Sequence, residues 1–214
     1  MATTRVIVVR HGQSFSNVEH RLCGLPPGPG LTPVGERQAD RAARILLATG
    51  EEPTVLLTSP LRRTRETARA LSARTGLEAA VVDDLRELQF GEWEGVTRGE
   101  MSADPRWDRW SRDPETFPPP GGERLSEAGA RVAGALEAAV RAHPGACIVA
   151  YSHHDPMLAF YVQATGGSWY DYPALAIPNA CILAFDHDGK AWNYTGADRR
   201  AAIKTLEADG EITA

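Results

Sequence analysis

The sequence predicts an α/β protein, a three-layer α/β/α sandwich around a mostly parallel sheet. Three apolar runs, at residues 5–9, 54–59 and 146–152, lack the polar alternation of a half-exposed strand. Such runs are typical of strands buried on both faces of a sheet. Helix-forming stretches separate the runs, and strands that alternate with helices favour parallel pairing with helices on both faces.

The first two long helices begin at recognisable signals. Thr32 followed by Pro33 is typical of an N-cap residue and a proline at the first helical position, and we expect this helix to reach Gly50. Ser59 followed by Pro60 repeats the pattern and predicts a second helix that ends near residue 75. Each helix is therefore expected to begin close to one edge of the sheet.

The remaining strands are predicted from shorter patterns. EAAVVD at 78–83 predicts a third strand. ACILAFDHDGKAWNY at 180–194 predicts a hairpin that turns at Asp188-Gly189. The run at 146–152 is followed by a helical stretch that we expect to start at Pro156.

One more long helix is expected between these strands, from near Glu123 to just before Pro144-Gly145. Its apolar residues fall on one stripe, as in a helix that packs one face on a core. They are Leu125, Val132, Leu136 and Val140.

Residues 88–123 differ from the rest of the chain. They contain Trp93, Trp107 and Trp110, many charges and the irregular stretch FPPPGG. We interpret them as a small cap insert over one end of the sheet, within a single domain that spans residues 1–214.

Composition narrows the class of protein. The 214 residues are 43% hydrophobic and 24% charged, which is ordinary for a globular protein, and the net charge of −5 argues against nucleic acid or anionic membranes as partners. Three scattered cysteines suggest neither a disulfide framework nor a zinc cluster. We see no signal-peptide pattern and no membrane-spanning run, so the reducing cytoplasm is the expected location.

Charged residues follow three of the predicted strands. In chain order they are Arg10, His11, Arg62, Arg63, His153 and His154. Because the carboxyl ends of parallel strands meet at one edge of a sheet, these side chains are expected to converge beside a helix N-terminus. Arginines, imidazoles and a helix N-terminus together favour a pocket for a phosphate dianion.

The same residues lie in motifs that resemble those of the histidine phosphatase superfamily, the phosphoglycerate-mutase-like proteins. VVRHGQSFSN at 8–17 resembles the signature of that family. The likeness continues, in the family's order, through RLCGLPPGPGLTPVGERQA, TSPLRRTRETA, LRELQFGEWEG, PPGGE and VAYSHHD. The resemblance covers most of the chain and implies a phosphoglycerate-mutase-like sandwich.

The resemblance implies a role for each matching residue. His11 matches the histidine that accepts the phosphoryl group, and Arg10, Arg63 and His153 match the residues that hold its oxygens, with Asn17 nearby. A neutral imidazole is a competent nucleophile when a hydrogen bond at its other nitrogen fixes the tautomer. Arginines and a charged second histidine would stabilise the transferring group.

The proton donor is assigned by the same resemblance. Glu87 in LRELQFG matches the carboxyl group proposed to protonate the leaving group, and a phosphate dianion beside it would raise its pKa. Arg62 is disfavoured as the phosphate ligand because the family's arginine lies four residues after the serine matched by Ser59. Gly12 is expected to leave room for the incoming phosphate.

Three further residues are expected at the substrate. Cys23 and Gly24 lie where relatives approach the ligand, although Cys23 could equally be an inert, buried thiol. His154 stands where the family commonly has glycine, and it either contacts substrate or is a packed loop residue. A metal site formed with Asp155 is a third interpretation, but neighbouring side chains diverge, and we expect no metal.

Two other phosphatase chemistries fit the sequence poorly. A cysteine phosphatase needs an arginine six positions after its cysteine, where this chain has Pro29, His153 and His187. AFDHDGK, with Asp186, resembles the aspartate-nucleophile motif of haloacid-dehalogenase-type phosphatases, but Lys190 departs from it. A hairpin turn explains that stretch better.

The function implied is hydrolysis of a small phosphate monoester (of a sugar, a nucleoside or a similar metabolite) through a phosphohistidine, with no metal and no cofactor. The partner expected is that small molecule, and a homo-oligomer is allowed. The alternatives are a cofactor-dependent phosphoglycerate mutase and a non-catalytic binder of phosphorylated ligands. The cap tryptophans and the arginines among them either select the leaving group or merely pack the cap.

Overall fold

The computed structural model describes residues 2–169 and 177–196. They contain a six-stranded sheet in the order β3-β2-β4-β1-β5-β6. The strands are β1 (Thr4–Arg10), β2 (Val55–Thr58), β3 (Ala79–Val81), β4 (Cys147–Ser152), β5 (Ile182–His187) and β6 (Trp192–Tyr194). Strands β3, β2, β4 and β1 pair in parallel, whereas β5 is antiparallel to both β1 and β6. The predicted mostly parallel sheet and hairpin are confirmed.

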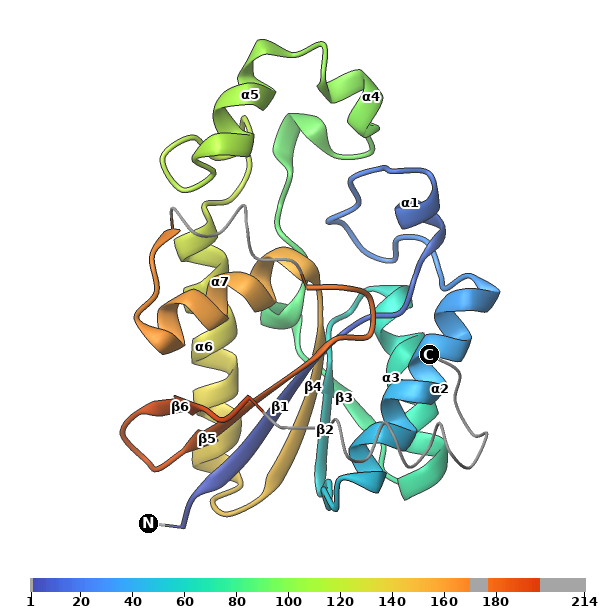
Figure 1. Cartoon of the computed structure of the whole chain (residues 1–214), viewed down its shortest axis with the longest axis vertical. Coiled ribbons are helices and arrows are strands. Elements are labelled where there is room, and N and C mark those ends of the chain that lie inside the picture. The colour runs from blue at the N-terminus through green and yellow to red at the C-terminus, as the bar shows by residue number, and fades with distance from the viewer. Residues whose placement is uncertain (1, 170–176, 197–214) are drawn as a thin grey trace.

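Four long helices complete the three predicted layers. Helices α2 (Pro33–Ala48) and α3 (Arg62–Thr75) cover one face of the sheet, and α6 (Leu125–Ala142) and α7 (His154–Thr165) cover the other (Figure 1). The predicted apolar stripe of α6 is wholly inside the core that α6 and α7 share. The sandwich is therefore confirmed.

Strand β1 shows why its sequence carries no polar alternation. Val6 and Val8 point into the core beneath α6 and α7, and Ile7 and Val9 point into the core beneath α2 and α3. All four side chains are fully buried. Each contributes about 2 kcal/mol of hydrophobic stabilisation, so the strand is fixed from both sides. Its carboxyl end, where Arg10 lies, is correspondingly rigid.

One predicted helix start is confirmed and two are shifted. The Thr32 hydroxyl accepts a hydrogen bond from the Gly35 amide (3.1 Å), as expected of an N-cap. Helix α3 begins at Arg62 and not at Pro60, because the Ser59 hydroxyl turns toward the Leu61 amide and a histidine ring instead. Helix α7 begins at His154, two residues before the predicted proline.

Residues 88–123 stand beyond the carboxyl ends of β1, β2 and β4 (Figure 1). They form a short 3₁₀ turn (Gly91–Trp93) and two helices, α4 (Arg98–Met101) and α5 (Pro105–Arg112). A second 3₁₀ turn spans Asp83–Leu85. A further short helix, α1 (Phe15–Val18), lies beside them. None of the helices in the described chain is both long and apolar enough to span a bilayer.

Candidate active site

The parallel register brings three strand ends to one point. Arg10 at the end of β1 pairs with Ser152 at the end of β4, and Thr58 at the end of β2 pairs with Tyr151. The chain leaves all three strands on the same edge of the sheet. His11, Arg63 and His153, which come from three separate motifs, therefore lie together.

His11 is held by its backbone and ring. It is 1% exposed, its amide donates to Ser152 O (3.1 Å), and its carbonyl accepts from the Ala180 amide (3.1 Å). The ring Nδ1 lies 2.6 Å from Gly12 O. Because a carbonyl can only accept, Nδ1 carries the proton, and Nε2 presents a lone pair.

The electrostatics keep Nε2 of His11 unprotonated. Burial, followed by the charges of Arg63 and Arg10, lowers the pKa of His11 well below its ordinary value. The Arg63 Nε donates to His11 Nε2 at 3.1 Å. His11 is therefore a neutral nucleophile of fixed tautomer. Its Nε2 faces the Arg63 guanidinium, which could also bind an anion placed beside His11.

The prediction that Gly12 leaves room for the incoming phosphate was wrong. A Cβ on Gly12 would lie 2.3 Å from Gly35 O, which belongs to the first turn of α2. The missing side chain lets the backbones of the two loops approach each other. Gly12 thus positions His11 against α2, and it does not make space for phosphate.

The two arginines approach His11 from different elements. Arg63, on the first turn of α3, is 2% exposed and donates from Nη2 to Cys23 O (2.9 Å). Its Nη1 is buried and has no hydrogen-bond partner in the described chain. Arg10 donates from its guanidinium to Ile177 O. Arg62, by contrast, has a side chain that is 64% exposed and pairs with Glu66, outside the site.

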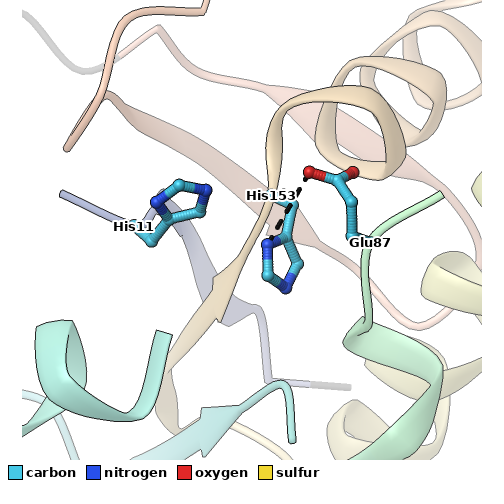
Figure 2. A group of neighbouring side chains, drawn as sticks. All are labelled: His11, Glu87 and His153. Carbon is cyan, nitrogen blue, oxygen red and sulfur yellow. Dashed lines mark ion pairs between the residues drawn. The ribbon is translucent and has the colours of Figure 1, made fainter. Parts of the chain in front are cut away.

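Glu87 and His153 complete the inner group (Figure 2). Glu87 Oε2 lies 3.7 Å from both His153 Nδ1 and Arg63 Nη2, and its Oε1 accepts from the Leu88 amide (3.0 Å). Burial, reinforced by the charge of Asp155, raises the pKa of Glu87 to about 7. The raised pKa that we expected a bound phosphate to produce in Glu87 is therefore already produced by burial and by the charge of Asp155.

His153 differs from the charged histidine expected. Its ring is fully buried, and burial together with the Arg63 charge lowers its pKa well below the ordinary value, so the ring is neutral near pH 7. Nε2 lies 2.8 Å from the Ser59 hydroxyl, and Nδ1 has no hydrogen-bond partner in the described chain. If Ser59 donates to Nε2, the Nδ1 proton points toward Glu87.

An arginine of α6 holds the segment that carries Glu87. Arg131 donates to the carbonyls of Asp84 (2.7 Å), Arg86 (2.8 Å) and Glu87 (3.0 Å). The same guanidinium makes an ion pair with Glu123 (2.7 Å), and both side chains are about 10% exposed. This clamp fixes the backbone at the proton donor.

The remaining predicted residues fall into two groups. Asn17, Cys23 and His154 line the cavity described below. Asn17 Oδ1 accepts from the Ser14 amide (3.0 Å) and from Asn179 Nδ2 (3.2 Å), so Asn17 also organises the loop after His11. Burial raises the pKa of Cys23. Its thiol is therefore protonated at neutral pH.

Gly24 lies outside the cavity wall. Its amide donates to the Glu94 carboxylate (2.8 Å), and a Cβ on it would lie 2.3 Å from Leu88 O. The requirement for glycine here is a close approach between two loop backbones. The structure thus gives Gly24 a loop-packing role.

Sequence reasoning missed several residues that organise the site. The sequence predicts Ser59 as a helix N-cap and offers Asp155 only as a possible metal ligand. Arg131 sits unremarkably in an amphipathic helix, and Asn179, whose Nδ2 donates to His11 O (3.2 Å), lies in an irregular stretch before β5. No local pattern marks these two residues, because their partners are far away in the sequence.

One group of the described residues could reach a metal ion: His11, Glu87 and His153, whose ligand atoms all lie within 4.8 Å of one another. The group is not the His153-His154-Asp155 cluster considered from the sequence. Arg63 donates to the His11 nitrogen that a metal would need. A cation would displace that bond and sit against a buried guanidinium, so the arrangement suits an anion better.

A cavity of about 510 Å³ opens over these groups. Its inner wall includes Arg10, His11, Arg63 and Glu87. Its outer wall comes from the end of α1 and from the cap, with Trp107 among the residues there. His153 lies behind the inner wall. The volume is typical of a small-molecule site.

Residues 6–198 match the histidine phosphatase superfamily (branch 1), and the chain belongs to that family. Two solved structures share its fold over most of both chains. A mycobacterial glucosyl-3-phosphoglycerate phosphatase in complex with VO3 has a TM-score of 0.80 at 30% identity, covering 89% of this chain and 96% of its own. YhfR of Bacillus stearothermophilus has a TM-score of 0.82 at 25% identity, covering 90% and 95%.

The names of the curated relatives indicate different activities. Bifunctional protein Rv2228c of Mycobacterium tuberculosis is 36% identical over 191 residues, 87% of this chain and 51% of its own. The glucosyl-3-phosphoglycerate phosphatase of that organism is 36% identical over 132 residues, 61% and 58%. A probable phosphoglycerate mutase, GpmB of Yersinia enterocolitica, is 29% identical over 209 residues, 96% and 95%. This chain spans about half the length of the first two.

Proposed function

We propose that this protein is a phosphatase that hydrolyses small phosphate monoesters through a phosphohistidine on His11. The observation that carries the proposal is the fixed tautomer of His11, whose Nε2 lone pair faces a buried guanidinium. Phosphate binding alone would need the arginines but neither an oriented nucleophile nor a protonated carboxyl group. Family membership and the phosphatases among the relatives support the same activity.

The first step transfers the phosphoryl group to the enzyme. His11 Nε2 attacks phosphorus, the bond from phosphorus to the ester oxygen breaks, and Glu87 gives its proton to that oxygen. A pKa of about 7 leaves roughly half of Glu87 protonated at neutral pH, so it can serve as the acid. In the second step a water attacks the phosphohistidine, the Glu87 carboxylate accepts its proton, and phosphate and neutral His11 are released.

The transferring group is stabilised by positioned donors. Arg10 and Arg63 carry the positive charge, and Nη1 of Arg63, which has no hydrogen-bond partner among the described residues, is available to a phosphoryl oxygen. His153 would donate from Nδ1 as a neutral imidazole, with Ser59 holding the tautomer. Because Arg63 and His153 are buried and Arg10 is half-buried before substrate arrives, little reorganisation is needed.

Phosphoglycerate mutase activity is the second candidate, since GpmB aligns with 96% of this chain. A mutase must keep its phosphoenzyme away from water until an acceptor binds. GpmB aligns with this chain over 95% of its own length, so a longer insert does not separate the two activities. The cap here contains only two short helices, and the cavity beneath it is open to solvent. These features favour phosphate release over transfer to a second phosphoglycerate.

The proposal is tested by trapping the intermediate. Rapid acid quench with ³²P-labelled substrate should give an acid-labile, alkali-stable phosphoenzyme with the native protein and none with His11→Ala. His143→Ala, an exposed histidine at the end of α6, is the matched control and should keep both label and turnover. Normal turnover by His11→Ala, or interconversion of phosphoglycerates without phosphate release, would overturn the proposal.

A further inference from the structure

Three residues of the inner cavity wall offer hydrogen-bond acceptors and not positive charge. They are Glu87, His154 and Asp155, and all three line the cavity. The arginines of the same wall suit the oxygens of a phosphoryl group, whereas acceptor atoms suit a molecule that donates hydrogen bonds. The second step of the proposed reaction needs such a molecule, because a water must attack the phosphohistidine.

The ring of His154 is held in one orientation. Its Nδ1 lies 3.2 Å from Ile177 O, and because a carbonyl can only accept, Nδ1 carries the proton. The neutral ring then presents a lone pair at Nε2. The same carbonyl accepts a hydrogen bond from the guanidinium of Arg10. One backbone oxygen therefore fixes His154 relative to an arginine that would hold the phosphoryl group.

Nε2 of His154 is placed to bind a water. It lies 3.9 Å from Asp155 Oδ1, which is too far for a hydrogen bond, and neither atom can donate to the other when the ring is neutral. Polar atoms at such a separation are often bridged by a water. The side chain of His154 is 31% exposed, so solvent reaches it. No donor in the described part of the chain forms a hydrogen bond with this nitrogen.

Glu87 lies close to the same carboxylate. The charge of Asp155 adds to burial in raising the pKa of Glu87, so Asp155 is near both Glu87 and His154. Glu87 Oε1 accepts from the Leu88 amide (3.0 Å), while Oε2 lies toward the His153 ring (Figure 2). The lone pair of His154 and the proton-accepting group of the second step thus belong to one region of the cavity.

His154 also departs from the pattern of the family at this position. Members commonly have glycine after the second histidine, whereas this chain has a histidine there. A glycine has no side chain that could bind a water. The substitution therefore adds an acceptor beside the reacting groups without replacing any residue assigned to the first step.

We propose that His154 is a further catalytic residue, which holds the water that attacks the phosphohistidine. The water donates one hydrogen bond to His154 Nε2 and gives its other hydrogen, as a proton, to the Glu87 carboxylate. Its oxygen bonds to phosphorus while the bond from phosphorus to His11 Nε2 breaks, and the electron pair of that bond returns to the ring. His154 stays neutral throughout. The inference rests on the proposed function and concerns only its second step.

The test measures the two steps separately by acid quench with ³²P-labelled substrate. Native protein and His154→Gly are loaded with label and chased with unlabelled substrate, and the decay of the phosphoenzyme is followed. We expect the phosphoenzyme of His154→Gly to decay at least tenfold more slowly and to reach a larger steady-state fraction. Because the first step is unaffected, kcat and KM should fall together, and kcat/KM should change less than twofold.

Added glycerol gives a second readout. An alcohol has a single hydrogen on the attacking oxygen, which goes to Glu87, so its attack does not use His154. The ratio of glycerol phosphate to free phosphate should therefore rise at least fivefold in His154→Gly. A loss of packing alone would not change this ratio in favour of the alcohol.

Two further variants complete the experiment. His154→Gln keeps an acceptor oxygen near the position of Nε2 and should recover at least a third of the native decay rate. His143→Gly, at an exposed histidine that ends α6, is the matched control and should decay like the native protein. Native decay by His154→Gly, or a fall in kcat/KM as large as that in kcat, would overturn the role of His154. Absence of labelled phosphoenzyme from the native protein and from His154→Gly would instead reject the proposed function.

Discussion

The two ends of the cavity differ in how their side chains are held. At the sheet edge, His11 is bound by Gly12 O and Arg63, and His153 contacts Ser59. At the cap, the side chains of Arg98 and His20 have no partner among the described residues. The inner end is preorganised for one reaction, whereas the outer end presents free groups to a ligand.

The difference has a physical basis. Phosphoryl transfer is catalysed by donors that are fixed before the charge moves, so the inner side chains gain from burial and from mutual hydrogen bonds. Recognition of a leaving group requires only side chains that gain a hydrogen-bond or ion-pair partner when the substrate binds. The cap can therefore change its side chains without disturbing the strands beneath it.

The largest expected effect is at the inner arginine. Arg63→Lys removes the fork that binds His11 Nε2 and Cys23 O together, and a lysine cannot replace it from a buried position. We expect kcat/KM to fall by about 10³-fold on every substrate. The neighbouring Arg62→Lys, whose side chain is exposed and paired with Glu66, is the matched control and should change kcat/KM less than twofold.

If kcat/KM fell by a similar factor in both variants, the forked guanidinium of Arg63 could not be the cause of the loss. Thermal unfolding should accompany the kinetics. Arg63→Lys must remain folded for the comparison to count.

The next effect is at the proton donor. Glu87→Gln should lower kcat by about 10²-fold for alkyl phosphates and much less for p-nitrophenyl phosphate, because an activated phenol leaves without an acid. Equal losses on both substrates would exclude Glu87 as the acid of the first step.

The pH profile follows from the same group. Burial and Asp155 raise the pKa of Glu87 to about 7, so kcat/KM for alkyl phosphates should fall as the pH rises through 7. The pKa values of His11 and His153 are lowered, so neither should protonate until well below their ordinary range, and the acid limb should not begin near 6.5. For p-nitrophenyl phosphate, whose leaving group needs no acid, the native protein should show a much weaker alkaline limb. An unchanged limb would assign it to another group.

The sequence predicted the inner end better than the outer end. The strand runs and the RHG, RRTRE and HHD motifs placed Arg10, His11, Arg63 and His153 at one edge, because the carboxyl ends of parallel strands meet there. It misjudged Gly12, whose reason lies in the approach of Gly35. The free state of Arg98 could not be predicted either, since it depends on which acids other backbone amides have already bound.

Ser59 shows a second limit of the sequence. A serine followed by proline predicts a helix cap, and the local signal is correct for many proteins. Here a tertiary contact to His153 competes for the same hydroxyl, and the helix begins at Arg62, two residues after the predicted Pro60. Long-range polar contacts therefore change the role of a residue without changing its local pattern.

The smallest expected effect concerns the clamp behind the inner end. Arg131 binds three carbonyls of the segment that carries Glu87, and it pairs with Glu123. Arg131→Lys keeps the charge but loses the fork, so the segment should loosen and kcat on alkyl phosphates should fall by roughly tenfold. The exposed Arg141→Lys on the same helix is the control. A merely structural role would lower the melting temperature and affect p-nitrophenyl phosphate equally. A positioning role predicts a selective loss on alkyl phosphates, together with a shifted alkaline limb, because the group displaced is the proton donor.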